Sequence, residues 1–302
     1  MATTILKTDG LTNSCKGFKA VDGLSIEIQP QMVYGLLGPN GSGKTTTLGM
    51  LLGVIRQSSG SFSWFENGES DENRKRIGAL LETPNFYPYL TAVQNLEITA
   101  KIKDIPNPTA EIERVLKEVD LFDRKDSKFS TYSLGMKQRL AIGATLLGDP
   151  ELLVLDEPTN GLDQQGIKDI RNLIRKIGKE GKTILIASHI LDEVEKVCTH
   201  CAILRKGKLI RTGTIAEIIG NQEVQLIKAY ATDMDKLRSY ISSNKTYTIY
   251  KDEEGQFIVS AAPGTKADDF NKDCFDNGIV LNELAVFNET LEDQFLEIVK
   301  TS

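Results

Sequence analysis

A glycine-rich segment at residues 38–46, with the sequence GPNGSGKTT, constrains the fold more than any other feature of this chain. An apolar run at residues 32–37 precedes it and predicts a buried strand, and residues 45–55 after it predict a helix. The pattern G-x-x-x-x-G-K-[ST] between a strand and a helix is typical of a phosphate-binding loop, in which backbone N–H groups and the helix N-terminus face the anion. The segment therefore predicts a nucleoside triphosphate site; the alternative is a glycine-rich turn without a ligand.

The loop also supplies the predicted contacts to the ligand. Lys44 is expected to reach the β- and γ-phosphates, and the Thr45 hydroxyl is expected to bind a magnesium ion, which prefers oxygen ligands. The predicted phosphate-binding residues of this segment are Asn40, Gly41, Ser42, Gly43, Lys44, Thr45 and Thr46.

Residues 151–157, with the sequence ELLVLDE, predict a buried parallel strand that ends in two carboxylates. Because ligands bind beyond the carboxyl ends of parallel strands, Asp156 is expected to approach the magnesium ion from the side opposite Thr45. Glu157 comes one residue later, and we expect it to accept a proton from the attacking water or to orient that water. In the alternative interpretation, Glu157 only caps a turn before Pro158.

Three further motifs indicate the family. The sequence YSLGMKQR at residues 132–139 lies before the acidic strand, PTNGLD at residues 158–163 follows it, and His189 comes after an apolar run at residues 183–187. In this order the motifs resemble the nucleotide-binding subunit of an ABC transporter, and the resemblance covers about residues 3–220. It identifies residues 133–136 as the signature motif, residues 160–163 as the D-loop and His189 as the switch histidine.

The resemblance implies an ATPase that uses ATP and Mg²⁺ and works as a homodimer or with a second, paired cassette. ATP held by Lys44 of one copy is closed over by Ser133 and Gly135 of the other, where a hydroxyl and a bare backbone at a helix start can contact the γ-phosphate. Asp163 belongs to the implied nucleotide-binding residues, and His189 is expected to hold the γ-phosphate and the attacking water in line.

Several residues depart from the family's commonest pattern. In the signature, usually Leu-Ser-Gly-Gly-Gln, the first, third and fifth positions differ while Ser133 and Gly135 are kept, so we expect a working but slower second half-site. Glu82 stands where most cassettes carry a glutamine, and it is expected to reach the magnesium ion or the lytic water. The aromatic residue that stacks on adenine aligns best with Cys15, and Phe18 is the nearest substitute.

Glu82, together with the sequence FYPYLT at residues 86–91, resembles a narrower group of ATPase subunits. These are the bacitracin-type and lantibiotic-immunity subunits of Gram-positive bacteria, which work with separate membrane permeases to remove antimicrobial peptides from the cell. The resemblance thus predicts peptide export as the function and integral membrane permease subunits as partners.

Composition and charge limit the other partners. A net charge of −6 and a pI of about 5.2 argue against a nucleic-acid partner, which usually needs a basic patch. No run of about 18 apolar residues is present, and residues 1–4 lack the features of a secretory signal. We therefore expect the protein in the cytoplasm, peripheral on the inner face of the cell membrane. The C-x-x-C spacing of Cys198 and Cys201 is better explained by packing than by zinc or redox chemistry.

The predicted fold class is α/β: a P-loop NTPase core of the ABC type with a parallel sheet and a helical subdomain, followed by a small α+β domain. Residues 1–220 are expected to form the ATPase cassette, with the helical subdomain at about residues 85–139. Residues 221–302 predict the order β-α-β-β-α-β of a ferredoxin-like accessory domain, with a terminal helix at residues 290–299. A regulatory or dimer-stabilising role and an inert cap both remain open for this domain.

Two other functions stay open at this point. A soluble ABC-type ATPase without a permease would be expected to carry tandem cassettes or a long coiled-coil insertion, and neither is present in this sequence. A non-hydrolysing, ATP-dependent dimerisation switch would not need Glu157 and His189, which are both retained.

Overall fold

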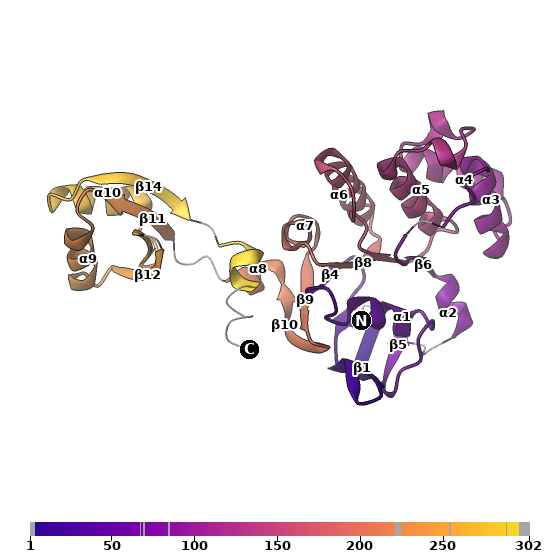
Figure 1. Ribbon diagram of the computed structural model, residues 1–302, viewed down its shortest axis with the longest axis horizontal. Helices are drawn as coiled ribbons and strands as arrows, with labels where there is room; N and C mark the ends of the chain where they lie inside the picture. Colours follow the sequence, from indigo (N-terminus) through magenta and orange to yellow (C-terminus); the bar gives the residue numbers. More distant parts are fainter. Residues whose placement is uncertain are drawn as a thin grey trace. The chain divides into compact units, whose positions relative to one another are not determined.

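The computed structural model in Figure 1 describes residues 4–66, 68, 70–83, 85–220, 225–253, 255–287 and 289–295. The chain divides into two compact units, Met1–Ile215 and Ala216–Ser302. The sequence-based domain boundary at residue 220 lies at the end of helix α8 (Ile215–Ile219), whereas the two compact units divide at its start.

A six-stranded sheet forms the centre of the first unit, with the strand order β10-β9-β4-β8-β7-β6. All neighbours in it run parallel except the edge strand β10, which is antiparallel to β9. Strands β4, β7 and β8 are buried along their whole length, as expected for parallel strands covered on both faces. In chain order the strands are β4 (Val33–Leu37), β6 (Ile77–Leu80), β7 (Leu152–Asp156), β8 (Thr183–Ser188), β9 (His200–Arg205) and β10 (Lys208–Thr214).

An antiparallel sheet packs against this core. It consists of β1 (Leu6–Cys15), β2 (Phe18–Leu24), β3 (Glu27–Ile28) and β5 (Ser59–Trp64). Its inner residues share one apolar cluster with β4, β7 and β8, and Trp64 lies in this cluster with Nε1 donating a hydrogen bond of 3.0 Å to the Leu51 carbonyl. The two sheets of the first unit thus pack on a common core.

Helices follow the strands of the parallel sheet, as in a doubly wound fold. Figure 1 shows α3, α4 and α5 grouped together near β6. Within the described ranges, no helix has the length and apolar composition needed to cross a bilayer. The helices are α1 (Lys44–Leu51), α2 (Asp71–Lys75), α3 (Ala92–Ile102), α4 (Pro108–Glu118), α5 (Leu134–Leu146), α6 (Gln164–Lys179) and α7 (Leu191–Val197), with 3₁₀ turns at Phe122–Arg124 and Phe129–Thr131.

The second unit contains an antiparallel sheet with the order β12-β13-β11-β14, and helices α9 and α10 complete the predicted β-α-β-β-α-β order. Residues 291–295 are helical, and residues 296–299 of the predicted terminal helix lie outside the described ranges. The sequence predicts the first strand of this unit at residues 223–231, of which residues 223–224 also lie outside the described ranges. The elements are β11 (Leu226–Ala231), α9 (Met234–Ser243), β12 (Tyr247–Glu253), β13 (Gln256–Ala261), α10 (Ala267–Asp276) and β14 (Leu281–Phe287).

A separate apolar cluster stabilises this second unit. Phe270 of α10 is fully buried in it, and its ring centroid lies 4.8 Å from that of Tyr247 in an edge-to-face arrangement. Because each unit has its own buried cluster, we expect the two units to unfold as separate cooperative transitions.

Replacement of Phe270 by Ala is expected to destabilise the second unit by about 3–5 kcal/mol, because it leaves a cavity in that core. Unfolding of the first unit can be followed separately by the fluorescence of Trp64, the single tryptophan of the sequence, which is 1% exposed. In urea titrations of Phe270→Ala we expect the second unit to unfold at a lower urea concentration by circular dichroism. The urea midpoint of the first unit, followed by Trp64 fluorescence, should not change. The control Phe275→Ala removes a side chain of the same helix that is 77% exposed, and it should shift neither transition. A Trp64 midpoint that moves with Phe270→Ala would contradict separate cores.

Candidate nucleotide-binding site

The predicted catalytic segments meet at one edge of the parallel sheet. In the register of the strands, Leu37 at the end of β4 pairs with Ser188 of β8, and Asp156 at the end of β7 pairs with Ala187. The phosphate loop, the acidic pair and His189 each follow directly from one of these ends. Parallel strands therefore bring together residues that are up to about 150 positions apart in the sequence, as expected for the ligand-binding edge of an open α/β sheet.

The backbone of the phosphate loop requires glycine at Gly43, the residue that precedes α1. Its φ angle is 104°, and a Cβ there would lie 2.4 Å from the Ala20 carbonyl oxygen. Lys44 is 5% exposed, and its Nζ donates a hydrogen bond of 2.7 Å to the Gly38 carbonyl. A buried cation beside a curled backbone at a helix N-terminus is the arrangement that accepts phosphate oxygens.

Asp156 lies at the bottom of this site and is 1% exposed. Within the described ranges its Oδ1 atom is buried without a hydrogen-bond partner. Burial raises the pKa of Asp156, whereas a hydrogen bond from the Thr45 side chain lowers it, so the hydroxyl and the carboxylate face each other. An unpaired carboxylate oxygen beside a hydroxyl fits a hard divalent cation such as Mg²⁺, for which phosphate oxygens and water would complete the ligand set.

Glu82 lies in the exposed segment after β6. Its φ angle is 56°, a value that residues other than glycine rarely adopt. It is close enough to Asp156 to raise the pKa of that carboxyl. Among the described residues, however, no three His, Cys, Asp or Glu side chains lie close enough together to hold a metal ion. Glu82 thus contributes charge to the site without completing a carboxylate cluster there.

Glu157 contacts two of the other predicted residues. Its Oε2 lies 2.8 Å from His189 Nδ1, and its Oε1 lies 3.4 Å from Lys44 Nζ. The residue has a φ of 47°, and its N–H donates to the Ala187 carbonyl, so the backbone turns out of the sheet at this point. The side chain is therefore held by two basic groups of the site instead of capping the turn before Pro158.

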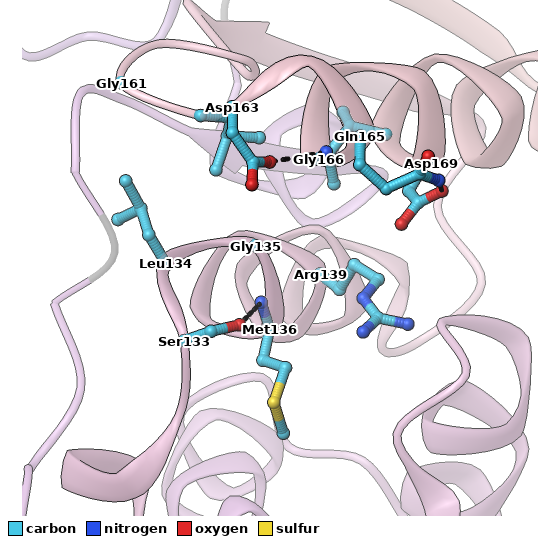
Figure 2. A pocket seen from close by; sticks show the side chains of 12 residues that line it. Ser133, Leu134, Gly135, Met136, Arg139, Gly161, Asp163, Gln165, Gly166 and Asp169 are labelled. Carbon is cyan, nitrogen blue, oxygen red and sulfur yellow. Dashed lines mark hydrogen bonds between the residues drawn. The ribbon is translucent and has the colours of Figure 1, made fainter.

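The signature residues lie in a different place. Figure 2 shows a hollow between the start of α5 and the loop that leads into α6. Its volume is about 370 Å³. The Ser133 side chain accepts a hydrogen bond from the Met136 N–H, and Asp163 accepts one from the Gly166 N–H, so each residue caps the helix that it precedes. Gly135 also lines this hollow, whereas no residue of the phosphate loop does. One chain thus holds the two halves of the predicted site apart.

Two exposed apolar side chains, Phe18 and Leu134, belong to the predicted nucleotide site and to the signature motif. Phe18 is 69% exposed and pairs with the exposed Cys15 where β1 and β2 meet, so both candidates for the adenine contact lie at the end of one hairpin. Leu134 is 49% exposed, and Figure 2 shows it reaching toward Gly161 of the neighbouring loop. A Cβ placed on Gly161 would lie 3.4 Å from Leu134 Cδ2, so this side chain lies beside the loop that the resemblance identifies as the D-loop.

Two buried polar residues near the site were not among the sequence predictions. Thr159 and Glu193 are 2% and 6% exposed, and the Thr159 hydroxyl donates a hydrogen bond to the Glu193 carboxylate. The signal that was available is a glutamate within the apolar face of a short helix, next to Val194. Cys198 and Cys201 are buried, and burial raises the pKa of the Cys201 thiol to about 12, in keeping with a packing role.

Comparisons with known proteins agree with this geometry. The family model described as ABC transporter matches residues 21–160. The chain is 38% identical to the bacitracin transport ATP-binding protein BcrA of Bacillus licheniformis, over 98% of both chains. It is 36% identical to the lantibiotic transport ATP-binding protein SrtF of Streptococcus pyogenes, over 68% of this chain and 89% of SrtF. A solved structure of the ADP conformation of MJ1267, an ATP-binding cassette of an ABC transporter, matches with a TM-score of 0.64 and 26% identity, over 71% of this chain and 92% of that one.

Asp156→Asn is expected to raise the melting temperature in EDTA, because it removes a buried charge whose Oδ1 atom has no hydrogen-bond partner among the described residues. Relief on the order of 1 kcal/mol corresponds to a shift of about 2–4 °C for a domain of this size. In Mg²⁺ and ATP we expect the parent chain to gain more stability than the variant, since an amide is a weaker ligand for this ion. Thermal melts in both buffers test this, and a variant that melts lower than the parent in EDTA would contradict a net cost of burying the Asp156 charge.

Proposed function

The chain belongs to the ATP-binding subunits of ABC transporters, which bind and hydrolyse ATP with Mg²⁺, and we propose that it drives the export of an antimicrobial peptide through a separate membrane permease. The similarity to BcrA, a bacitracin transport protein, runs through both units of the chain, and SrtF, a lantibiotic transport protein, adds a second peptide-related relative. Antimicrobial peptides of this class are therefore the proposed cargo.

The proposed working form is a pair of cassettes that share each ATP. The observation that carries it is the separation, within one chain, of the Lys44 cradle from the hollow lined by Ser133 and Gly135. In a symmetric pair, the start of α5 in the second copy would complete the site of the first. The positive end of this 13-residue helix suits a γ-phosphate, and no atom lies within 4 Å of a Cβ placed on Gly135, so the backbone is open to close approach.

We propose that the triphosphate and its metal ion are held by the phosphate loop, Asn40 to Thr46 with Lys44 among them, and by Asp156. When bound, the metal ion would neutralise charge at the β- and γ-phosphates. A triphosphate attracts Lys44 Nζ more strongly than one carboxylate does, so Glu157 Oε1 becomes free to accept a hydrogen bond from the attacking water. His189 Nδ1 holds the other oxygen of Glu157, which fixes the carboxylate and leaves Nε2 for the γ-phosphate.

The remaining predicted roles stay part of the proposal. Phe18 is the proposed contact to adenine, Asp163 fixes the loop that faces the second copy, and Glu82 acts on the metal ion or the lytic water. Residues 1–220 are the proposed cassette and residues 221–302 the accessory domain.

The permease contact is proposed at the segment between β6 and α3. Tyr87 and Tyr89 are 50% and 65% exposed, and their ring centroids lie 5.8 Å apart. The buried Asn95 fixes this segment, because it accepts a hydrogen bond from the Tyr87 N–H and donates one to the Tyr87 carbonyl. Exposed aromatic side chains on a fixed backbone are typical of protein interfaces. Contact with a permease would place the chain in the cytoplasm, on the inner face of the membrane.

Glu157→Gln is expected to lower ATP turnover at least about 100-fold, since general bases contribute factors of 10²–10⁴, while ATP affinity stays within about twofold because the phosphate loop is intact. The variant should accumulate as an ATP-bound dimer in size-exclusion chromatography. In cells that carry the permease, it should also lose protection against bacitracin or a lantibiotic. Lys44→Ala, the matched control, should lose both ATP binding and dimer formation.

Two results would contradict this proposal in different ways. Parental turnover by Glu157→Gln would remove Glu157 as the base. If cells that lack the chain altogether show unchanged peptide sensitivity, the proposed peptide export is wrong, whereas the ATPase activity is not affected by this result.

A further inference from the structure

Glu193 is a buried carboxylate that the proposed chemistry does not use. It lies in the first turn of α7, four residues after His189, and is 6% exposed. One carboxylate oxygen accepts the hydrogen bond from Thr159, and within the described ranges the other, Oε1, is buried without a partner. The hollow next to it has a volume of about 10 Å³, which is room for at most one water molecule.

Packing alone gives no reason for a carboxylate at this position. Burial raises the pKa of Glu193, and the hydrogen bond from Thr159 and the nearby Arg171 lower it only in part. Arg171 itself donates to Asp192 at 3.1 Å, so it is not a dedicated partner of Glu193. An apolar side chain would fill such a site at lower cost, and buried carboxylates with altered pKa values gather at functional sites.

The location of the hydrogen bond suggests what it does. Thr159 lies two residues after Glu157 and directly before the loop at residues 160–163, and its carbonyl accepts a hydrogen bond from the Leu162 N–H of that loop. Glu193 belongs to the helix that follows His189. The hydrogen bond therefore connects the segment after β7, which contains Glu157 and the loop at residues 160–163, to the segment after β8, which contains His189.

We propose that Glu193 is a positioning residue that holds Thr159, and through it the loop at residues 160–163, in fixed register with His189. It acts on hydrolysis through these two segments and does not touch the nucleotide. The inference rests on the proposed role of this loop in facing the second copy, and it is independent of the cargo.

Four single variants and one double variant of the full chain test this role by ATPase kinetics. Glu193→Leu removes the acceptor and Thr159→Val removes the donor at nearly constant shape, and each should lower kcat at least about tenfold while KM for ATP stays within about twofold. Glu193→Gln keeps an acceptor oxygen and should retain kcat within about threefold. Asp192→Asn, a control on the exposed side of the same helix, should match the parent. The double variant Thr159→Val/Glu193→Leu should be no slower than the slower single variant, since both remove the same bond.

Amide hydrogen exchange provides a measurement that does not depend on turnover. Glu193→Leu and Thr159→Val should both speed exchange at residues 159–163 and leave β7 unchanged, whereas Glu193→Gln should match the parent. Parental exchange and kcat in both of the first two variants would overturn the inference, as would additive losses in the double variant. If Glu193→Gln lowers kcat as much as Glu193→Leu does, the effect comes from the lost charge and not from the lost hydrogen-bond acceptor, and the inference is also wrong. If Glu157→Gln is inactive while the Glu193 variants are not, the proposed function stands and only this inference falls.

Discussion

The contacts of Glu157 are the interaction on which the arrangement of the site depends. Its two oxygens lie 3.4 Å from Lys44 Nζ and 2.8 Å from His189 Nδ1, so one carboxylate links the segments that follow β4, β7 and β8. The parallel register of these strands brings the three residues to one edge, and full burial of the strands keeps that edge fixed. The same edge holds Asp156, whose unpaired oxygen suits the metal ion that accompanies ATP.

Much of this site could be predicted because each of its residues lies within seven positions after the end of an apolar run. Lys44, Asp156, Glu157 and His189 all come after segments that read as buried strands, and parallel strands place their carboxyl ends together. The order of elements in the second unit could be predicted for a similar reason, since its strands and helices differ clearly in periodicity. The structure shifts most of these elements by only one or two residues, although helix α1 ends at Leu51, before the predicted residue 55.

The other features of the site depend on contacts that the periodicity of the sequence does not reveal. Ser133 and Asp163 were predicted to bind nucleotide, but that they also cap α5 and α6 follows only from the backbone that each one precedes. The pairing of Thr159 with Glu193 joins residues 34 positions apart, on a turn and a helix, and a buried glutamate in an apolar face gives no indication of its partner. The left-handed backbone of Glu82 and Glu157 is likewise set by the turns around them and not by residue type.

The central claim is that two copies of the chain complete each ATP site, and complementation tests it most directly. Lys44→Ala removes the cation of the cradle, and Gly135→Asp places a negative charge where the γ-phosphate of the partner copy is proposed to lie, in open space that lets the chain fold. Each variant alone should be inactive. An equimolar mixture should recover turnover up to about half of the parental value, because each mixed pair holds one intact site of two and neither variant forms a productive pair with itself. A mixture as inactive as the separate variants would contradict the shared site.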